Sequence, residues 1–369
     1  MNYSNKFDIQ DVLMKLGNLN FSKIFNKLKY LLICYVTGKS IGNYKLHRQY
    51  KPKNIKMIKL PPELKIKHTD FKMCEISSKS LEHYIRNFIS VVLDNIPKND
   101  LIIFLNNLST LQVASSDHIL VNLFFNLVLG NNSVGFYDPK NNNILVNEDS
   151  CSVAIYHELF HMASSVFKDE ISYSGFRQSS IKDKNMDLGV GINEGYTELM
   201  ARRYFRSNVK VSLAYEREVE IARRLEEIVG KDKMQSLYLN ANLPGLIEEL
   251  KQYSTEEEIM KFISSTDFVC KNLSNKKTKM VKKIMLIDSL NYVNKFLIKA
   301  YTTKMLQQFE ENDLTEEIKR YVHSLNSYIT IGNEECKILS NDDIIECFES
   351  IYKNMNSSKI EKSSVSIKK

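Results

Sequence analysis

Apolar residues recur at helical spacing along most of the chain, which predicts a largely helical protein. Outside the central region, the predicted helices are Asp8–Val36 with a break near Gly17–Asn20, Ser80–Leu93, Asp117–Leu129, Ser212–Val229, Lys233–Leu239, Pro244–Tyr253, Thr255–Ile263, Lys279–Leu306, Thr315–Tyr328 and Asp342–Tyr352. The last third is therefore expected to be nearly all helix. The final segment, Ser357–Lys369, is rich in Ser and Lys and is expected to be a disordered tail.

Strand patterns are few and short. Leu101–Leu105 is an apolar run bounded by polar residues, which predicts a short buried strand. Val134–Tyr137 and Asn143–Val146 flank the turn-rich segment Asp138–Asn142, so they are predicted to form a hairpin. This hairpin leads directly into the next helix. A strand there offers an edge to which an extended peptide can add by main-chain hydrogen bonds.

The helix after the hairpin is apolar around most of its circumference and is capped by Asp149 or Ser150, so we expect it to be buried. Its apolar positions are Val153, Ile155, Tyr156, Leu159, Phe160, Met162, Ala163, Val166 and Phe167. Its narrow polar stripe consists of Ala154, His157, Glu158, His161 and Ser165. Burying that stripe is costly unless it faces a metal, a partner or water.

The stripe contains the sequence H-E-x-x-H. His157 and His161 are one helical turn apart, so their imidazoles can converge on one zinc ion, with Glu158 beside them. The pattern is typical of metal-dependent hydrolases. The competing interpretation is two histidines and a glutamate that hydrogen-bond within an ordinary core.

A second group of acidic residues follows the long polar loop expected at Lys168–Leu188. If Asn193 starts a helix to about Arg206, Glu194 and Glu198 lie on one face, and Gly195 permits close packing. Catalytic zinc sites often use two His and one Glu. We favour Glu194 as the third ligand, because Glu198 can then accept a hydrogen bond from a ligand imidazole; Glu198 is the alternative ligand.

Together the two motifs resemble those of the gluzincin metallopeptidases, the thermolysin-like and aminopeptidase-like enzymes with H-E-x-x-H followed by Asn-Glu-x-x-x-Asp/Glu. The resemblance covers about Val134 to Tyr204. It implies an α+β zincin-like core with a small sheet and an active-site helix. It also implies one Zn²⁺ and the following roles: His157, His161 and Glu194 as ligands, Glu158 as general base, and Glu198 and Asn193 as residues that support the ligands.

Two features depart from that family. The interval between His161 and Glu194 is longer than in many aminopeptidase-like members. In addition, no downstream Tyr or His aligns with the family residue that stabilises the oxyanion. Tyr173 and Tyr215 are the candidates for this catalytic role, and either is equally consistent with an ordinary amphipathic tyrosine.

Composition changes this picture little. The chain has 369 residues and a net charge of +7 that is spread over many lysines, and its six cysteines include no C-x-x-C pair. The start of the chain lacks a secretory signal and no membrane span is evident, so we expect a cytoplasmic protein; leaderless secretion would leave the same sequence. The basic, proline-containing segment Tyr44–Lys72 is interpreted as a connection, and nucleic-acid binding through it is the weaker alternative.

The sequence thus predicts an α+β protein with a zincin-like core and a mostly helical C-terminal part. We expect residues 1–72 to form a helical segment and basic arm, 73–254 the catalytic domain, 255–355 a helical subdomain and 356–369 the tail. The expected activity is hydrolysis of peptide or protein substrates by a zinc-activated water, with Glu158 as base. The alternative is a non-catalytic module that binds metal or peptide. The oligomeric state is not predicted.

Overall fold

The computed structural model describes residues 56–59, 70–73, 80–115, 135–146, 151–180, 182–183, 186–205, 215–273, 280–308, 314–325, 328–331, 334–337, 349 and 353. The predicted helices at 8–36 and 117–129, most of the one at 342–352, and the predicted tail lie outside these residues.

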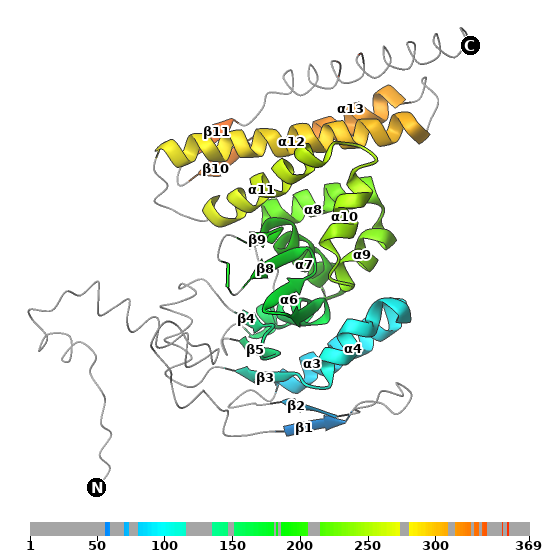
Figure 1. The fold of residues 1–369 in the computed structure, drawn as a ribbon, viewed down its shortest axis with the longest axis vertical. Helices are drawn as coiled ribbons and strands as arrows, with labels where there is room; N and C mark the ends of the chain where they lie inside the picture. The colour runs from blue at the N-terminus through cyan, green and yellow to red at the C-terminus, as the bar shows by residue number, and fades with distance from the viewer. Residues whose placement is uncertain are drawn as a thin grey trace, which may run out of the picture.

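The fold is α+β, with small sheets followed by a mostly helical C-terminal part (Figure 1). The helices are α3 (Ser80–Asn95), the 3-10 helix η2 (Lys98–Leu101), α4 (Ile102–Leu108), α6 (Cys151–Ala163), α7 (Val190–Phe205), α8 (Glu216–Val229), α9 (Lys231–Leu239), α10 (Leu243–Leu250), α11 (Glu256–Leu273), α12 (Met280–Gln308) and α13 (Leu314–Ser324). The strands are β1 (Lys56–Lys59), β2 (Asp70–Met73), β3 (Gln112–Ser115), β4 (Gly135–Asp138), β5 (Asn143–Val146), β6 (Ser165–Lys168), β7 (Ile171–Ser174), β8 (Arg177–Ser180), β9 (Asp187–Leu188), β10 (Tyr328–Ile331) and β11 (Glu334–Lys337).

The first sheet has the strand order β1-β2-β3-β5-β4. Its predicted hairpin is confirmed: β4 and β5 pair antiparallel, with Gly135 opposite Val146 and Asp138 opposite Asn143. Strands β2 and β3, and β3 and β5, pair in parallel. Among the described strands, β4 is therefore an edge of this sheet, and it packs against α6. Strand β1 lies within the basic segment Tyr44–Lys72, which was interpreted as a connection, and β2 lies at the end of that segment.

Two apolar segments in the first half of the chain form other elements than predicted. The run Leu101–Leu105 is not a strand: Leu101 ends η2 and the rest belongs to α4, whose Phe104 and Leu108 are buried on one face at helical spacing. A short apolar run does not separate a strand from one helical turn. The helix predicted to run through Phe167 ends at Ala163, and the chain continues as β6.

The segment predicted as a long polar loop is instead a four-stranded antiparallel sheet, in the order β6-β7-β8-β9. Its first turn, Asp169-Glu170, has positive φ at both residues, as the tight turn of a two-residue hairpin requires. Because Asp-Glu is not one of the usual dipeptides for that turn, the residue types at this position do not predict the hairpin. This sheet connects α6 to α7, the two helices that carry the motifs.

In the C-terminal half, the predicted helices that fall on described residues are confirmed, with α11 longer than expected. Figure 1 shows α11 and α12 as neighbouring layers above α7 and α8, with α13 beside α12. One prediction fails here: the helix expected through Tyr328 ends at Ser324, and Tyr328 begins a hairpin of β10 and β11.

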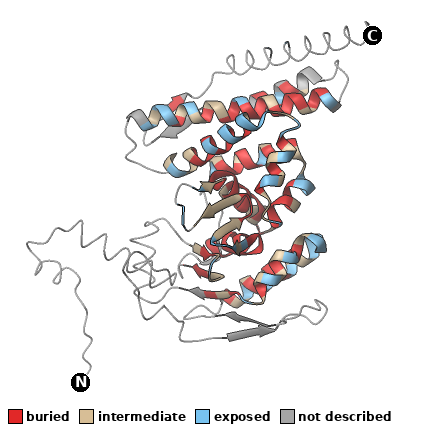
Figure 2. Cartoon of the chain, in the orientation of Figure 1, coloured by how far each residue is buried: buried red, intermediate tan, exposed pale blue. Residues whose placement is uncertain are grey.

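The main core runs through the whole assembly of helices, and α6 and α7 lie at its centre (Figure 2). The outer helix α3 alternates buried and exposed positions, as expected of a helix that faces solvent on one side, whereas the second half of α12 is almost entirely buried. None of the described helices is both long and apolar enough to span a bilayer.

Candidate metal centre

Helix α6 presents the H-E-x-x-H residues from inside the core. Leu159, Phe160 and Met162 are fully buried on its other sides, as the sequence predicted. His157, Glu158 and His161 are themselves at most 9% exposed. A buried polar cluster of this kind needs partners for its charges and hydrogen-bonding groups, and helix α7 supplies most of them.

Helix α7 begins at Val190, three residues earlier than predicted, and carries Glu194 and Glu198 on the face toward α6. A neighbouring side of α7 lies against α8 at Gly195. A Cβ atom added at Gly195 would overlap the carbonyl oxygen of Glu218, so only glycine permits this approach. Gly195 thereby fixes how closely the helix with the two carboxylates packs between its neighbours.

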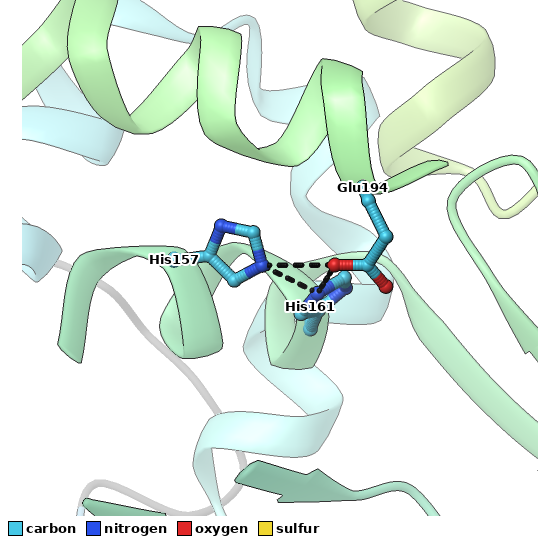
Figure 3. A group of neighbouring side chains, drawn as sticks. All are labelled: His157, His161 and Glu194. Atoms are coloured by element: carbon cyan, nitrogen blue, oxygen red, sulfur yellow. Dashed lines mark hydrogen bonds and ion pairs between the residues drawn. The ribbon is translucent and has the colours of Figure 1, made fainter. Parts of the chain in front are cut away.

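The side chains of His157, His161 and Glu194 converge on one point between α6 and α7 (Figure 3). The Nε2 atoms of the two histidines are 3.0 Å apart. Oε2 of Glu194 lies 3.2 Å from Nε2 of His157 and 3.5 Å from Nε2 of His161. These three residues form a group that could hold a metal ion.

The spacing of these atoms fits a small tetrahedral ion. In a tetrahedral site with bonds of about 2.0 to 2.1 Å, the ligand atoms are about 3.3 Å apart. The three separations of 3.0, 3.2 and 3.5 Å bracket that value and describe one face of such a tetrahedron. Two imidazole nitrogens and one carboxylate oxygen are also the donors that Zn²⁺ accepts, and they leave a fourth corner for another ligand.

Glu158 lies between α6 and the edge strand β4. Its carboxylate accepts a hydrogen bond from the backbone N–H of Tyr137 on β4. A Cβ atom at Gly135 would lie 2.6 Å from Oε1 of Glu158 and 2.7 Å from its Cγ. The bare backbone of Gly135 therefore provides the space that this carboxylate occupies, and β4 fixes its orientation.

Glu198 holds the far side of His157. Its Oε2 atom is 3.0 Å from Nδ1 of His157, as expected if Glu198 supports a ligand instead of being one. Its other oxygen accepts from Nε of Arg202 at 2.8 Å, and Arg202 also pairs with Glu216 on α8 at 2.9 Å. The Glu198 carboxylate is therefore fixed at both oxygens.

The charges around the group favour a cation. Burial lowers the pKa of His157, but the hydrogen bonds that it donates to the carboxylates of Glu194 and Glu198 outweigh this effect and raise the pKa to about 10. Burial raises the pKa of Glu194, yet the two histidines hold it well below its ordinary value. The pKa of Glu158 is raised, chiefly by burial. Three carboxylates thus surround two imidazoles, and positive charge at this point is strongly stabilised.

The structure separates the two tyrosine candidates. The ring of Tyr215 stacks on that of His157, with centroids 5.6 Å apart and planes at 12°. The charge of the Glu194 carboxylate is the largest cause that raises the pKa of Tyr215. Tyr173 lies on β7 opposite Val166 and Gln178, and no contact among the described residues joins it to the histidines.

Asn193 and two residues that the sequence analysis did not single out complete the surroundings of His161. Asn193 accepts from the backbone N–H of Phe176 at 3.1 Å and places its amide nitrogen 3.4 Å from Nδ1 of His161. Thr197 Oγ1 lies 3.5 Å from the same nitrogen and 2.6 Å from the hydroxyl of Tyr238. Thr197 could have been found from its position one turn after Asn193, whereas no local signal marks Tyr238 on α9.

The chain matches no protein-family model, no curated protein sequence and no solved structure. The chemistry of the site is therefore the basis on which a function can be assigned.

Proposed function

We propose that this protein is a zinc-dependent metallopeptidase. The observation that carries the proposal is the convergence of two imidazole nitrogens and one carboxylate oxygen, with Glu158 beside them on the same helix. His157, His161 and Glu194 would hold the ion. The H-E-x-x-H and Asn-Glu-x-x-x-Glu motifs that carry these residues resemble those of the gluzincin peptidases.

Zinc bound by these residues would supply a Lewis acid that polarises a substrate carbonyl and lowers the pKa of a coordinated water. Glu158 would take the proton of the attacking water as the new C–O bond forms. It then gives the proton to the amine as the C–N bond breaks, so one carboxylate acts as base and then as acid. The raised pKa of Glu158 suits both roles.

Tyr215 is the better of the two candidates for stabilising the oxyanion. Its ring stacks on that of His157, whereas no contact among the described residues joins Tyr173 to the histidines. Burial and the carboxylate keep the phenol protonated, and a protonated hydroxyl can donate a hydrogen bond to developing negative charge.

The position of the edge strand β4 favours a peptide as the substrate over a small ester or amide. It lies against the helix that carries Glu158, and Tyr137 already contributes a backbone N–H to that carboxylate. An extended peptide that adds to β4 by main-chain hydrogen bonds would pass beside Glu158. Such binding would depend little on the side chains of the peptide.

Metal analysis and peptide cleavage test the proposal together. The purified protein should bind one zinc and cleave members of an unbiased peptide library, and Glu194→Ala should lose both properties. One bound zinc without any cleavage would instead identify a non-catalytic metal-binding module. Failure of the wild-type protein to bind zinc would reject the proposal.

A further inference from the structure

The Nδ1 atom of His161 needs a hydrogen-bond acceptor if the proposed metal is bound. The Nε2 atom of this histidine faces the other two ligand atoms, at 3.0 Å from His157 Nε2 and 3.5 Å from Glu194 Oε2. An imidazole that gives Nε2 to a metal carries its proton on Nδ1. Metal-bound histidines usually donate that proton to a carboxylate, a carbonyl or water.

Asn193 cannot be the acceptor. Its Oδ1 atom accepts the backbone N–H of Phe176 at 3.1 Å, which fixes the orientation of the amide. The amide group nearest His161 is therefore Nδ2, at 3.4 Å from Nδ1, and an amide nitrogen only donates. Rotating the amide would place two donors against each other at Phe176.

The hydroxyl of Thr197 has one acceptor position available for this proton. A hydroxyl has one hydrogen and two lone pairs. Thr197 gives its hydrogen to the carbonyl oxygen of Asn193 at 2.7 Å. The hydroxyl of Tyr238, 2.6 Å away, then donates to one lone pair, and the second faces Nδ1 of His161 at 3.5 Å.

Tyr238 is held in place as a donor. The side chain is fully buried, and its ring packs against Phe176 and Tyr196 with centroids 5.6 and 5.1 Å apart. Burial raises the pKa of its phenol, so the hydroxyl keeps its proton; Thr197 and Ser164 are its two hydrogen-bond partners. The packing of α9, which carries Tyr238, thus determines which hydrogen bonds the Thr197 hydroxyl makes.

We infer that Thr197, with its hydroxyl oriented by Tyr238, accepts the Nδ1 proton of His161 and positions this imidazole for the metal. The inference rests on the proposed function only in taking a metal at Nε2. The two imidazoles are then held by different chemistry, His157 by the carboxylate of Glu198 and His161 by a pair of neutral hydroxyls. Thr197 and Tyr238 are positioning residues and touch neither metal nor substrate.

The test compares zinc affinity in variants that differ by single hydroxyl groups, measured by competition with a chromophoric chelator. Thr197→Val removes the acceptor at nearly constant volume and should weaken zinc binding by about tenfold, the lower end of the usual effect of losing such a partner. Thr197→Ser keeps the hydroxyl and should bind zinc within about threefold of wild type. Tyr238→Phe should weaken binding in the same direction as Thr197→Val.

Matched controls separate this role from simple packing. Thr303→Val removes a helical threonine hydroxyl that bonds to the carbonyl of Lys299, and Tyr204→Phe removes a phenol that donates to Gln235. Neither should change zinc affinity. The unfolding temperature of each metal-free variant reports the structural cost of its substitution.

A second measurement locates the proton itself. In the cobalt-loaded protein, NMR should show a slowly exchanging, hyperfine-shifted ring N–H resonance for each of the two histidines, and Thr197→Val should lose one of them to exchange with solvent. If wild type binds zinc and Thr197→Val binds it equally well with both resonances kept, the inference is wrong while the proposed function stands. If wild type binds no zinc, both are rejected.

Discussion

His157 Nδ1 lies 3.0 Å from Oε2 of Glu198, a carboxylate carried one turn after Glu194 on the same helix. The spacing places the two carboxylates on opposite sides of one imidazole: Glu194 lies near Nε2 and Glu198 near Nδ1. This arrangement explains why α7 needs two glutamates on one face. The first can reach a metal, and the second orients the ring that binds it.

Replacing Glu198 by Gln should weaken zinc binding more than replacing Thr197. The amide accepts the His157 proton without a full negative charge and cannot also accept from Arg202. We expect a loss of about 10- to 100-fold in zinc affinity, measured by chelator competition. Glu220→Gln removes a carboxylate that pairs with Arg224 on α8 and should leave zinc affinity unchanged. Equal affinities for Glu198→Gln and wild type would show that Glu198 does not support the ligand.

A methyl group at Gly135 should displace the proposed base. The added Cβ atom would lie 2.6 Å from Oε1 of Glu158 and 3.0 Å from Cβ of Ala154, so the carboxylate or β4 must move. A misplacement of about 1 Å in a catalytic group can cost about 100-fold in rate. Gly135→Ala should therefore lower kcat by about this factor and still bind one zinc. Unchanged kcat would mean that the position of Glu158 does not limit the reaction.

Tyr215→Phe distinguishes the two tyrosines. The phenylalanine ring can keep its stacking on His157 and lacks only the hydroxyl. Loss of one oxyanion donor costs about 100- to 1,000-fold in kcat, so we expect a decrease of that order with zinc content unchanged. Tyr173→Phe, on β7, is the matched control and should behave as wild type. The reverse outcome would assign the oxyanion role to Tyr173.

Asp267 should make folding stability depend on pH. This buried carboxylate on α11 accepts from the backbone N–H groups of Gly189 and Gly191, at 2.8 and 2.9 Å, at the start of α7. Burial raises its pKa from 3.8 to about 6. Because the folded pKa is above the unfolded one, the folded state binds the proton more tightly, and the contribution of Asp267 is greatest below about pH 4 and is lost as pH rises through about 6.

Asp267→Asn removes this titration. A shift of about two pKa units corresponds to about 3 kcal/mol. Relative to Asp267→Asn, the free energy of unfolding of wild type should therefore fall by up to about 3 kcal/mol between about pH 3 and 7, as measured by urea denaturation at each pH. Parallel pH profiles for the two proteins would contradict the raised pKa.

The sequence predicted the candidate site better than it predicted the sheet beside it. His157, His161, Glu194 and Glu198 were found because helical periodicity alone places residues one turn apart on a common face. The strands between the two helices were missed, because segments as short as Ile171–Ser174 are mostly polar and only half buried. Their pairing depends on turn geometry that the residue types at Asp169-Glu170 do not indicate.

The remaining gaps involve contacts between distant parts of the chain. Tyr238 reaches Thr197 from another helix, and Asp267 reaches the start of α7 from residues far along the chain. No local pattern carries that information, because such contacts follow from how the helices pack. The same holds for Tyr215. The sequence did not distinguish it from Tyr173 as the residue that stabilises the oxyanion, whereas its stacking on His157 favours it.

Replacing Glu158 by Gln tests the central claim most directly, with zinc content and peptide-library cleavage measured on the same preparations. Glu158 is placed outside the three-residue group that could hold the metal, so the variant should bind one zinc as wild type does. It cannot take the proton of the attacking water, so cleavage should fall by at least about 100-fold. Zinc-loaded Glu158→Gln protein that cleaves the library as fast as wild type would contradict this account.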